Sequence, residues 1–344
     1  MKKIAILGHF SKNHPSVDGQ TIKTLNLSRA LSLSENVEVC EIDTHGWKRH
    51  PLRLILAINR AMKSCDAIIM LPARRGVQVF SYLLNALNVR KGRKIYYDVI
   101  GAWLPSLLKS KPHLIKTLKK FDGIWCETNT LKTALENMDF ENVCVVPNFK
   151  DIRPIAENEL KFIEDLPIRL VIFSRISKAK GVSDAIEAIG RTNSGSIKYT
   201  LDIYGPIDGS YRDRFNELVN ENSSFVNYGG VVESGASVDV LKGYHALLFP
   251  TRYYTEGIPG TIIDAYCAGL PVISARWESY ADICFEGETS LGYKQGNVDD
   301  LVDLLQRISD DISIVNNMKA FSLDHGSKYT ITEMVKQICT LIDV

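Results

Sequence analysis

The chain has 344 residues, of which 45% are apolar and 24% charged, and its formal net charge is +1. A chain of this length has room for about two domains, each with its own hydrophobic core. No segment has the roughly 18 uninterrupted apolar residues of a membrane-spanning helix, and the start MKKIAILGHF runs into polar SKNH too early for a secretion signal. We therefore expect a globular, cytoplasmic protein.

Seven cysteines are scattered along the chain, and no two of them have C-x-x-C spacing. Several lie inside apolar stretches that are typical of strands. A cysteine in such a place behaves as a small core residue, and cytoplasmic thiols stay reduced. We therefore expect neither disulfides nor a zinc site.

Charge is divided unevenly between the two halves of the chain. Residues 1–150 hold 23 Lys and Arg against 12 Asp and Glu, a net +11, whereas residues 151–344 hold 18 against 28, a net −10. The basic residues of the first half are concentrated in 48–63, 73–75, 89–94 and 109–120, mixed with apolar residues at helical spacing. Such stretches suit an anionic membrane surface or acceptor, or are solvated helix faces. No aromatic stacking platform accompanies them, so we expect no nucleic acid partner.

Apolar runs that predict strands alternate with helical or loop stretches throughout. They cover residues 3–7, 37–42, 67–72, 94–99, 123–128 and 143–148, then 169–174, 199–204, 225–230, 246–251 and 271–275. Near-continuous apolar strands separated by helical crossovers indicate parallel sheets covered on both faces. We predict an α/β fold with two doubly wound Rossmann-like domains, at 1–152 and 153–323. The boundary falls in the acidic, proline-bracketed stretch 151–167, and a helical segment, 324–344, is expected to return to the first domain.

The most informative stretch is 253–275, YYTEGIPGTIIDAYCAGLPVISA. Glu256 precedes a turn made by Gly257, Ile258, Pro259 and Gly260, and Thr261 then opens a short helix. Glycines allow close backbone approach to a ligand, and the free N–H groups of a helix start bind anions. The alternative is a capping-box variant in which Thr261 and Asp264 only cap the helix.

A second motif follows the strand RLVIFS. Arg175 comes at its end, and Lys180 lies five residues on, just before Gly181 and a predicted helix. Two cations beside a helix start would neutralise a diphosphate, each charge-assisted hydrogen bond contributing roughly 1.5–3 kcal/mol. The alternative is a solvated basic turn. Two further strand exits, Tyr204-Gly205 and Gly229-Gly230, let the backbone approach a nucleotide.

In the first half, the strand 3–7 leads into the loop 8–21, after which Gly19, Gln20 and Thr21 start a helix. This loop is not the dinucleotide-binding G-x-G-x-x-G pattern, and no Walker-type G-K-[ST] occurs in the chain. The sequence therefore favours neither a redox enzyme nor an ATP-hydrolysing one.

The order SRISKAKG, LDIYG, VNYGGVV, LLFPT and EGIPGTIIDAYCAGLPVISARW resembles the carboxyl-terminal domain of family 4 glycosyltransferases. That family has the GT-B architecture, in which two Rossmann-like domains face each other across a cleft. The segments DGQTIKT, YYDVIGAWLP and VVPNF are similar to the branch found in bacterial capsule and surface-polysaccharide clusters, so the resemblance covers nearly the whole chain. Glu256 and Asp264 stand at the places of the family's E-x7-E pair, with Asp as the second acid.

The resemblance implies roles for residues of both domains. Arg175 and Lys180 would hold the donor diphosphate, Glu256 would contact the sugar hydroxyls, and Asp98 is the nearest match to the residue near the anomeric carbon. Asp264 would bind the nucleotide ribose, its shorter side chain being a departure from the family. The remaining residues implied in substrate binding are Gly19, Gln20, Thr21, Gly101, Trp103, Asn148, Tyr204, Gly205, Gly257, Ile258, Pro259, Gly260 and Thr261. Asp98 could equally be only a strand-end turn residue.

The resemblance also implies the reaction. A sugar would pass, with retention of configuration, from a UDP- or GDP-linked donor to a saccharide acceptor of capsule, O-antigen or exopolysaccharide synthesis, such as one linked to a lipid diphosphate. No D-x-D pair occurs, so we expect no metal and no cofactor, the leaving group being neutralised by Arg and Lys. The basic first half would bring the protein to the inner face of the plasma membrane. The alternatives are a sugar-nucleotide epimerase of the same architecture and a catalytically inert sugar-nucleotide-binding subunit.

Overall fold

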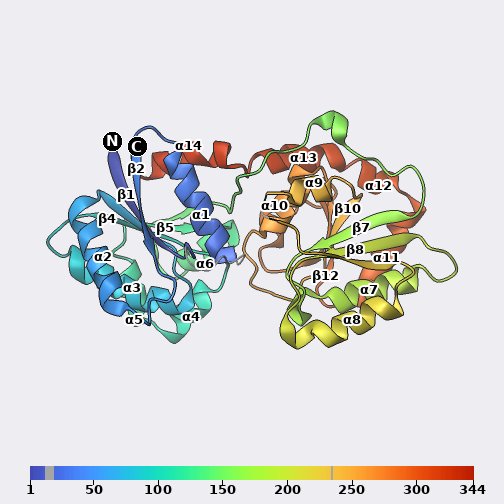
Figure 1. Cartoon of the computed structure of the whole chain (residues 1–344), viewed down its shortest axis with the longest axis horizontal. Helices are drawn as coiled ribbons and strands as arrows, with labels where there is room; N and C mark the ends of the chain where they lie inside the picture. The colour runs from blue at the N-terminus through green and yellow to red at the C-terminus, as the bar shows by residue number, and fades with distance from the viewer. Residues whose placement is uncertain (12–18, 234) are drawn as a thin grey trace. The chain divides into compact units, whose positions relative to one another are not determined.

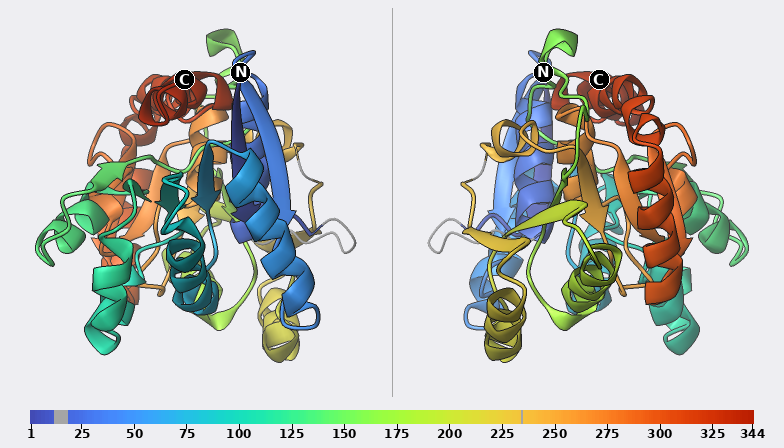
Figure 2. Two further views of the ribbon diagram at one scale, coloured as in Figure 1. Left: turned by 90° about the vertical axis from the view of Figure 1, so that its left-hand side faces the viewer. Right: turned by 90° about the vertical axis from the view of Figure 1, so that its right-hand side faces the viewer.

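The computed structural model describes residues 1–11, 19–233 and 235–344, which form two compact units. The first unit consists of residues 1–151 and 331–344, and the second of residues 152–330. Each unit is a parallel β-sheet with helices on both faces (Figures 1 and 2), so the predicted α/β fold with two doubly wound sheets is confirmed. Compactness does not test independent folding, so the domain bounds 1–152, 153–323 and 324–344 stay a prediction.

The first sheet has the strand order β2-β1-β3-β4-β5-β6. Its strands are β1 (Lys2–Gly8), β2 (Val37–Asp43), β3 (Ala67–Met70), β4 (Lys94–Asp98), β5 (Gly123–Cys126) and β6 (Val143–Val145). Successive side chains of β1 point into two different hydrophobic cores. Ala5 and Leu7 belong to the core on one face of the sheet, and Ile4 and Ile6 belong to the core on the other face. This period of two explains why the strand is apolar at nearly every position.

The helices of the first unit are divided between these two cores. Helices α1 (Gly19–Ser32) and α14 (Ile331–Leu341) pack side by side on one face (Figure 1), where α14 contributes Ile331, Met334 and Ile338. The other face is covered by α2 (Pro51–Ser64), α3 (Arg74–Asn88), α4 (Leu104–Ser110), α5 (His113–Leu118) and α6 (Asn129–Glu136). The last helix of the chain is therefore part of the first unit.

The second sheet has the order β12-β11-β10-β7-β8-β9. Its strands are β7 (Ile168–Phe173), β8 (Tyr199–Tyr204), β9 (Val226–Gly230), β10 (Ala246–Phe249), β11 (Val272–Arg276) and β12 (Ser290–Lys294). One face carries α7 (Val182–Thr192), α8 (Arg212–Glu221), α11 (Val298–Asp310) and α12 (Ser313–Asn316), and the other α9 (Ser237–Leu241), α10 (Gly260–Cys267) and α13 (Lys319–Ser327).

Strand β12 was not predicted from the sequence. It lies at the edge of the sheet, pairs only with β11, and alternates apolar Leu291 and Tyr293 with small or polar residues. The run of apolar residues that marks an interior strand is therefore absent. Among the described residues, no helix is long and apolar enough to cross a membrane.

A buried lysine lies under the second sheet. Lys319 begins α13 with a side chain that is only 1% exposed, and its Nζ donates a hydrogen bond to the carbonyl of His245 at 2.8 Å. No carboxylate of a described residue pairs with it. Burial therefore lowers the pKa of Lys319 to about 7.

This lysine makes the free energy of unfolding depend on pH. The unfolded chain keeps its Lys319 proton up to the ordinary value of 10.5, whereas the folded chain loses it near pH 7, so stability rises with pH between these values. The slope approaches about 1.4 kcal/mol per pH unit. We expect Lys319→Met, which keeps the volume and removes the charge, to raise the melting temperature at pH 7 and to flatten this slope.

Thermal and denaturant unfolding from pH 6 to 10 measures the effect. The matched control is Lys161→Met, because Lys161 is an exposed lysine near the same histidine. Equal slopes for the wild type and Lys319→Met would show that Lys319 stays charged in the folded protein.

Candidate active site

In each parallel sheet, the carboxyl ends of the strands meet at one edge, where ligands bind. In the second unit, the loops after β7 and β10 are tied together at this edge. The amide of Arg252 donates to the carbonyl of Ala179 at 2.9 Å. Gly181 has φ +68°, and a Cβ at this residue would lie 1.8 Å from the carbonyl oxygen of Pro250. Only glycine permits this approach, which fixes one loop against the other.

Two residues predicted for the site meet across these loops. Lys180 lies in the 3₁₀ turn Lys178–Lys180, and its Nζ forms an ion pair with Oε1 of Glu256. Thr251 donates to the same carboxylate oxygen at 3.2 Å, and the ammonium lies 5.4 Å from the centroid of the Phe249 ring. The side chains are 24% and 14% exposed, so a ligand can reach both. The site thus presents a cation and a hydrogen-bond acceptor side by side.

Arg252 holds the second loop in place. Its guanidinium binds the carboxylate of Asp184 in the first turn of α7 through two hydrogen bonds, at 2.6 and 2.7 Å. These hydrogen bonds raise the pKa of the Arg252 guanidinium above its usual value. This bidentate pair connects the loop after β10 to a rigid helix.

Helix α10 begins beside Glu256. Its first residue is Gly260, and Pro259 at the cap position makes no side-chain hydrogen bond to the helix. Oγ1 of Thr261 is inaccessible to solvent and has no hydrogen-bond partner among the described residues. Thr261 therefore does not cap the helix in the way that the capping-box alternative requires. Asp264 is only 2% exposed inside the helix.

The predicted strand exit at Tyr204 and Gly205 has a tight backbone. Gly205 has φ +135°, and a Cβ there would lie 2.0 Å from the carbonyl oxygen of Ser174. The hydroxyl of Tyr204 bonds to that of Tyr244 at 2.9 Å, so this side chain is held in the protein. Arg175 is exposed at the end of β7. Hydrogen bonds from Ser210 hold the pKa of Asp208 below its usual value, and Arg175 contributes to this lowering.

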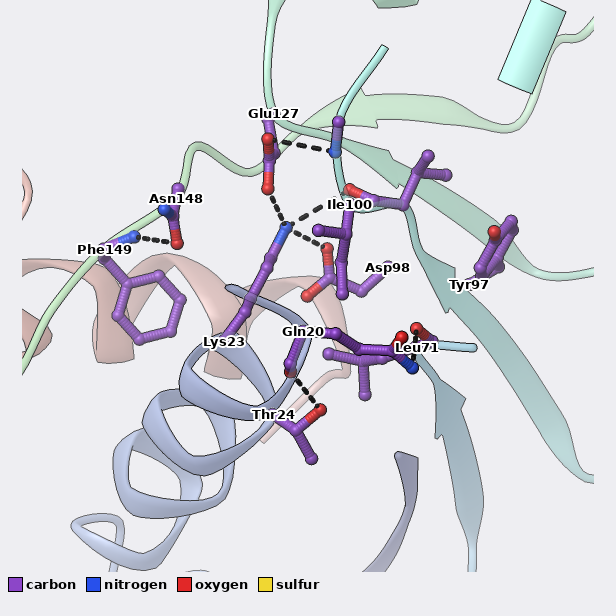
Figure 3. A network of polar contacts seen from close by, with 12 residues as sticks. Gln20, Lys23, Thr24, Leu71, Tyr97, Asp98, Ile100, Glu127, Asn148 and Phe149 are labelled. Atoms are coloured by element: carbon purple, nitrogen blue, oxygen red, sulfur yellow. Dashed lines mark hydrogen bonds and ion pairs between the residues drawn. The ribbon is translucent and has the colours of Figure 1, made fainter. Parts of the chain in front are cut away.

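In the first unit, Asp98 ends β4 and is completely buried. Its Oδ1 lies 2.7 Å from Nζ of Lys23 in α1, an ion pair without ideal hydrogen-bond alignment (Figure 3), and its Oδ2 has no hydrogen-bond partner among the described residues. Glu127, at the end of β5, lies 3.0 Å from the same ammonium. Burial raises the pKa of the Asp98 carboxyl to about 6, although Lys23 opposes the rise.

The remaining predicted residues of the first unit lie at the same edge. Gly101 adopts φ +74°, and Nε1 of Trp103 donates to the carbonyl of Ile100 at 2.7 Å. Gly19 starts α1, and no atom of the described residues lies within 4 Å of the place where a Cβ would stand, so its backbone is open to approach. The side chains of the other three form hydrogen bonds. Gln20 donates to the carbonyl of Leu71, the Thr21 hydroxyl bonds to Nδ1 of His9, and Oδ1 of Asn148 accepts from the amide of Phe149. Residues 12–18 of the predicted loop 8–21 lie outside the described part of the chain.

Sequence reasoning missed Lys23, Glu127, Thr251 and Arg252. Lys23 occurs in the quoted segment DGQTIKT, and Glu127 follows the strand GIWC directly, as a strand-end residue. Their positions in the sequence were the features from which Lys23 and Glu127 could have been predicted as site residues. Across the described ranges, no three His, Cys, Asp or Glu residues are placed to hold a metal ion.

Comparisons with known proteins bear on the fold and the family of this chain. Residues 167–311 match the family model "Glycosyl transferases group 1". No match was found among curated proteins. Among solved structures, sucrose-phosphate synthase from Thermosynechococcus elongatus has a TM-score of 0.79 at 14% identity, over 100% of this chain and 98% of that one. Alr3699/HepE from Anabaena, in complex with UDP and glucose, has a TM-score of 0.74 at 15% identity, over 100% of both chains. The lipopolysaccharide outer core galactosyltransferase WaaB has a TM-score of 0.71 at 18% identity, over 99% of both chains.

The ion pair of Lys180 and Glu256 yields a prediction with two opposite outcomes. If Lys180 has its predicted role, an anionic diphosphate competes with Glu256 for the Lys180 ammonium. We expect Lys180→Met to weaken binding of UDP or GDP by at least about tenfold, the loss of one charge-assisted hydrogen bond. Glu256→Gln removes the competing charge, and it is expected to keep or tighten that binding.

Isothermal titration calorimetry measures both affinities. Lys178→Met is the matched control, because Lys178 is an exposed lysine on the same 3₁₀ turn and should leave binding unchanged. If Lys180→Met binds as tightly as the wild type, Lys180 is not a phosphate ligand.

Proposed function

We propose that this chain, a group 1 glycosyltransferase with the GT-B fold, transfers a sugar from a UDP-linked donor to a saccharide acceptor of surface-polysaccharide synthesis. The observation that carries the proposal is the Lys180 and Glu256 pair at the start of α10, within the matched residues 167–311. UDP is favoured because HepE was solved with UDP and with UDP-glucose. The acceptor class is favoured by WaaB, a lipopolysaccharide outer core galactosyltransferase.

The donor binds to the second unit in this proposal. Arg175 and Lys180 hold the diphosphate, and the backbone from Gly257 to Thr261 meets the sugar and the phosphates. As the bond to the sugar breaks, negative charge grows on the leaving diphosphate. The loop that carries Lys180 is already fixed, so only the side chain turns from Glu256 to the diphosphate to stabilise that charge; one such donor is worth about 10²–10³ in rate. The two cations make a metal ion unnecessary.

Glu256 exchanges its ion pair with Lys180 for hydrogen bonds with the sugar. When the diphosphate draws Lys180, the carboxylate is released to accept hydrogen bonds from the sugar hydroxyls, while Thr251 keeps it in place. Ribose binding by Asp264 and backbone contacts at Tyr204 and Gly205 complete the donor site.

The first unit supplies the acceptor side. Asp98 acts at the reacting sugar, and transfer proceeds with retention of configuration. The other residues proposed for this side are Gly19, Gln20, Thr21, Gly101, Trp103 and Asn148.

The decisive test separates donor binding from transfer. We expect Glu256→Gln to bind UDP at least as well as the wild type but to lose at least about 10²-fold in the release of UDP from its donor. UDP-glucose, UDP-galactose, UDP-N-acetylglucosamine and GDP-mannose are the donors to screen, with nucleotide release and the anomer of the freed sugar as readouts. Activity should persist in EDTA.

A donor turned over only after addition of Mg²⁺ or Mn²⁺ would overturn the metal-independent mechanism. Release of the sugar with inverted configuration would overturn retention. An isomerised sugar nucleotide without transfer would mean that the chemistry is epimerisation.

Helix α2 supports a membrane-bound acceptor. Its inner face is buried, but Leu52 and Leu56 are 75% and 55% exposed on the outer face. Arg53, Arg60 and Lys63 are exposed on the same helix, and no described carboxylate pairs with them. An apolar strip flanked by basic side chains suits an anionic lipid surface, where each basic residue gains about 1 kcal/mol. We propose that the first unit docks there to reach a lipid-diphosphate-linked acceptor.

We therefore expect the protein to sediment with anionic vesicles at low salt and to dissociate as ionic strength rises. Charge reversal of Arg53, Arg60 and Lys63, or within 89–94 or 109–120, should weaken binding. Reversal of exposed Arg212 and Arg214 in the second unit is the control and should not. Equal sedimentation with neutral vesicles would contradict electrostatic docking.

A further inference from the structure

Helix α1 packs polar side chains against the chain segments that follow β3, β4 and β6. Gln20 donates to the carbonyl of Leu71 at 3.5 Å, Lys23 to that of Val99 at 3.2 Å, and Asn26 to that of Phe149 at 2.8 Å. Lys23 is 2% exposed and Asn26 is 8% exposed. Burial of polar and charged groups opposes folding unless each is satisfied. An apolar helix face would hold the helix at lower cost, so this polar face calls for another explanation.

Lys23 is the centre of this face (Figure 3). Its ammonium lies 2.7 Å from Oδ1 of Asp98, 3.0 Å from Oε1 of Glu127 and 3.2 Å from the carbonyl oxygen of Val99. These three acceptors match the three N–H groups of an ammonium. A single side chain on α1 therefore joins the ends of β4 and β5.

Glu127 extends the network to the loop after β4. Its Oε2 accepts a hydrogen bond from the amide of Gly101 at 3.2 Å. The segment 99–101 is thus held at both ends, because Lys23 binds the carbonyl of Val99 while Glu127 binds the amide of Gly101. Gly101 is in the left-handed region at φ +74°, so the chain turns sharply where it is held.

Among the described residues, the carboxylates of this cluster outnumber its cations. Two buried carboxylates face one ammonium, and Oδ2 of Asp98 has no hydrogen-bond partner among the described residues. Among the described residues, Tyr97 on β4, Cys126 on β5 and Cys144 on β6 also interact electrostatically with Asp98, and all three are neutral near pH 7 because burial raises their pKa values. Lys23 and Glu127 therefore act on Asp98 in opposite directions, the first favouring its ionised form and the second disfavouring it.

We infer that Lys23 and Glu127 are positioning residues for the transfer reaction, which together fix the 98–101 segment and set the ionisation of Asp98. The inference rests on the proposed role of Asp98 at the reacting sugar. A cluster that served only to hold the helix would need neither a second carboxylate nor an unpartnered carboxylate oxygen, since buried ion pairs are often no better than apolar packing.

The pH profile of kcat tests this inference. Lys23→Met removes the cation next to Asp98, so the limb of the profile that reports Asp98 should move up by about 1–3 pH units. Glu127→Gln removes the competing anion, and the same limb should move down. In each variant kcat at the optimum should fall by about tenfold to hundredfold, with a change of less than about threefold in KM for the donor, because the loop shifts by a fraction of an ångström.

Controls separate positioning from stability. Asn26→Ala loses a buried bond of the same helix without a change of charge, so it should lower the melting temperature and leave the pH profile in place. Lys23→Arg keeps the charge and should restore the profile. If Lys23→Met folds poorly, the double variant with Glu127→Gln removes the excess charge and should recover stability.

The ionisation of Asp98 can be followed without activity. In protein labelled with ¹³C at aspartate, the Asp98 signal is the one lost in Asp98→Asn, and its titration should move in the same opposite directions in the two variants. If the NMR titration moves but no limb of kcat follows it, the role of Asp98 in transfer fails while the electrostatic inference stands. If neither variant moves the NMR titration, the inference is overturned.

Discussion

The contact of Gly181 with the carbonyl of Pro250 is the constraint on which the second unit's site depends. A side chain at position 181 would collide with the backbone of the loop after β10, and the positive φ of Gly181 excludes most residues in any case. With glycine there, the loops after β7 and β10 touch, and Lys180 faces Glu256. The bidentate pair of Arg252 and Asp184 then holds the second loop to α7. The cation and the carboxylate thus take their places from backbone geometry rather than from their mutual attraction.

The two buried lysines show how surroundings decide what a charge does. Lys319 has one carbonyl partner, so burial dominates and its pKa falls. Burial lowers the pKa of Lys23 as well, but Asp98 and Glu127 outweigh it, so the pKa of Lys23 is raised and the ammonium stays charged. The first lysine lies beside the amino end of β10, away from the ligand edge, and the second lies at the strand ends where ligands bind. Of these two buried lysines, the one between two carboxylates keeps its full charge.

Much of the fold and part of the site could be predicted from the sequence, for identifiable reasons. Interior strands such as β1 and β10 are apolar at nearly every position because helices cover both faces, whereas the edge strand β12 lacks that signature. The proximity of Lys180 and Glu256 follows from the rule that parallel strands end at one edge. That they pair with each other does not follow, because the sequence motif indicates contacts with a ligand and not contacts between its own residues. Lys23 and Glu127 escaped prediction because the sequence around a charged residue in a first helix or at a strand end does not show whether its side chain points inward.

The return of α14 makes the first unit discontinuous in sequence. Residues 1–151 alone would lack Ile331, Met334 and Ile338, which fill the core beside α1, and would lose the bond from Gln337 to the carbonyl of Val145. A fragment cut at residue 151 would expose that apolar surface to water and aggregate. Residues 152–330, in contrast, form an unbroken segment with its own two cores. Any dissection of this protein is therefore asymmetric: the second unit is one continuous segment, whereas the first needs the chain's last helix to be grafted back.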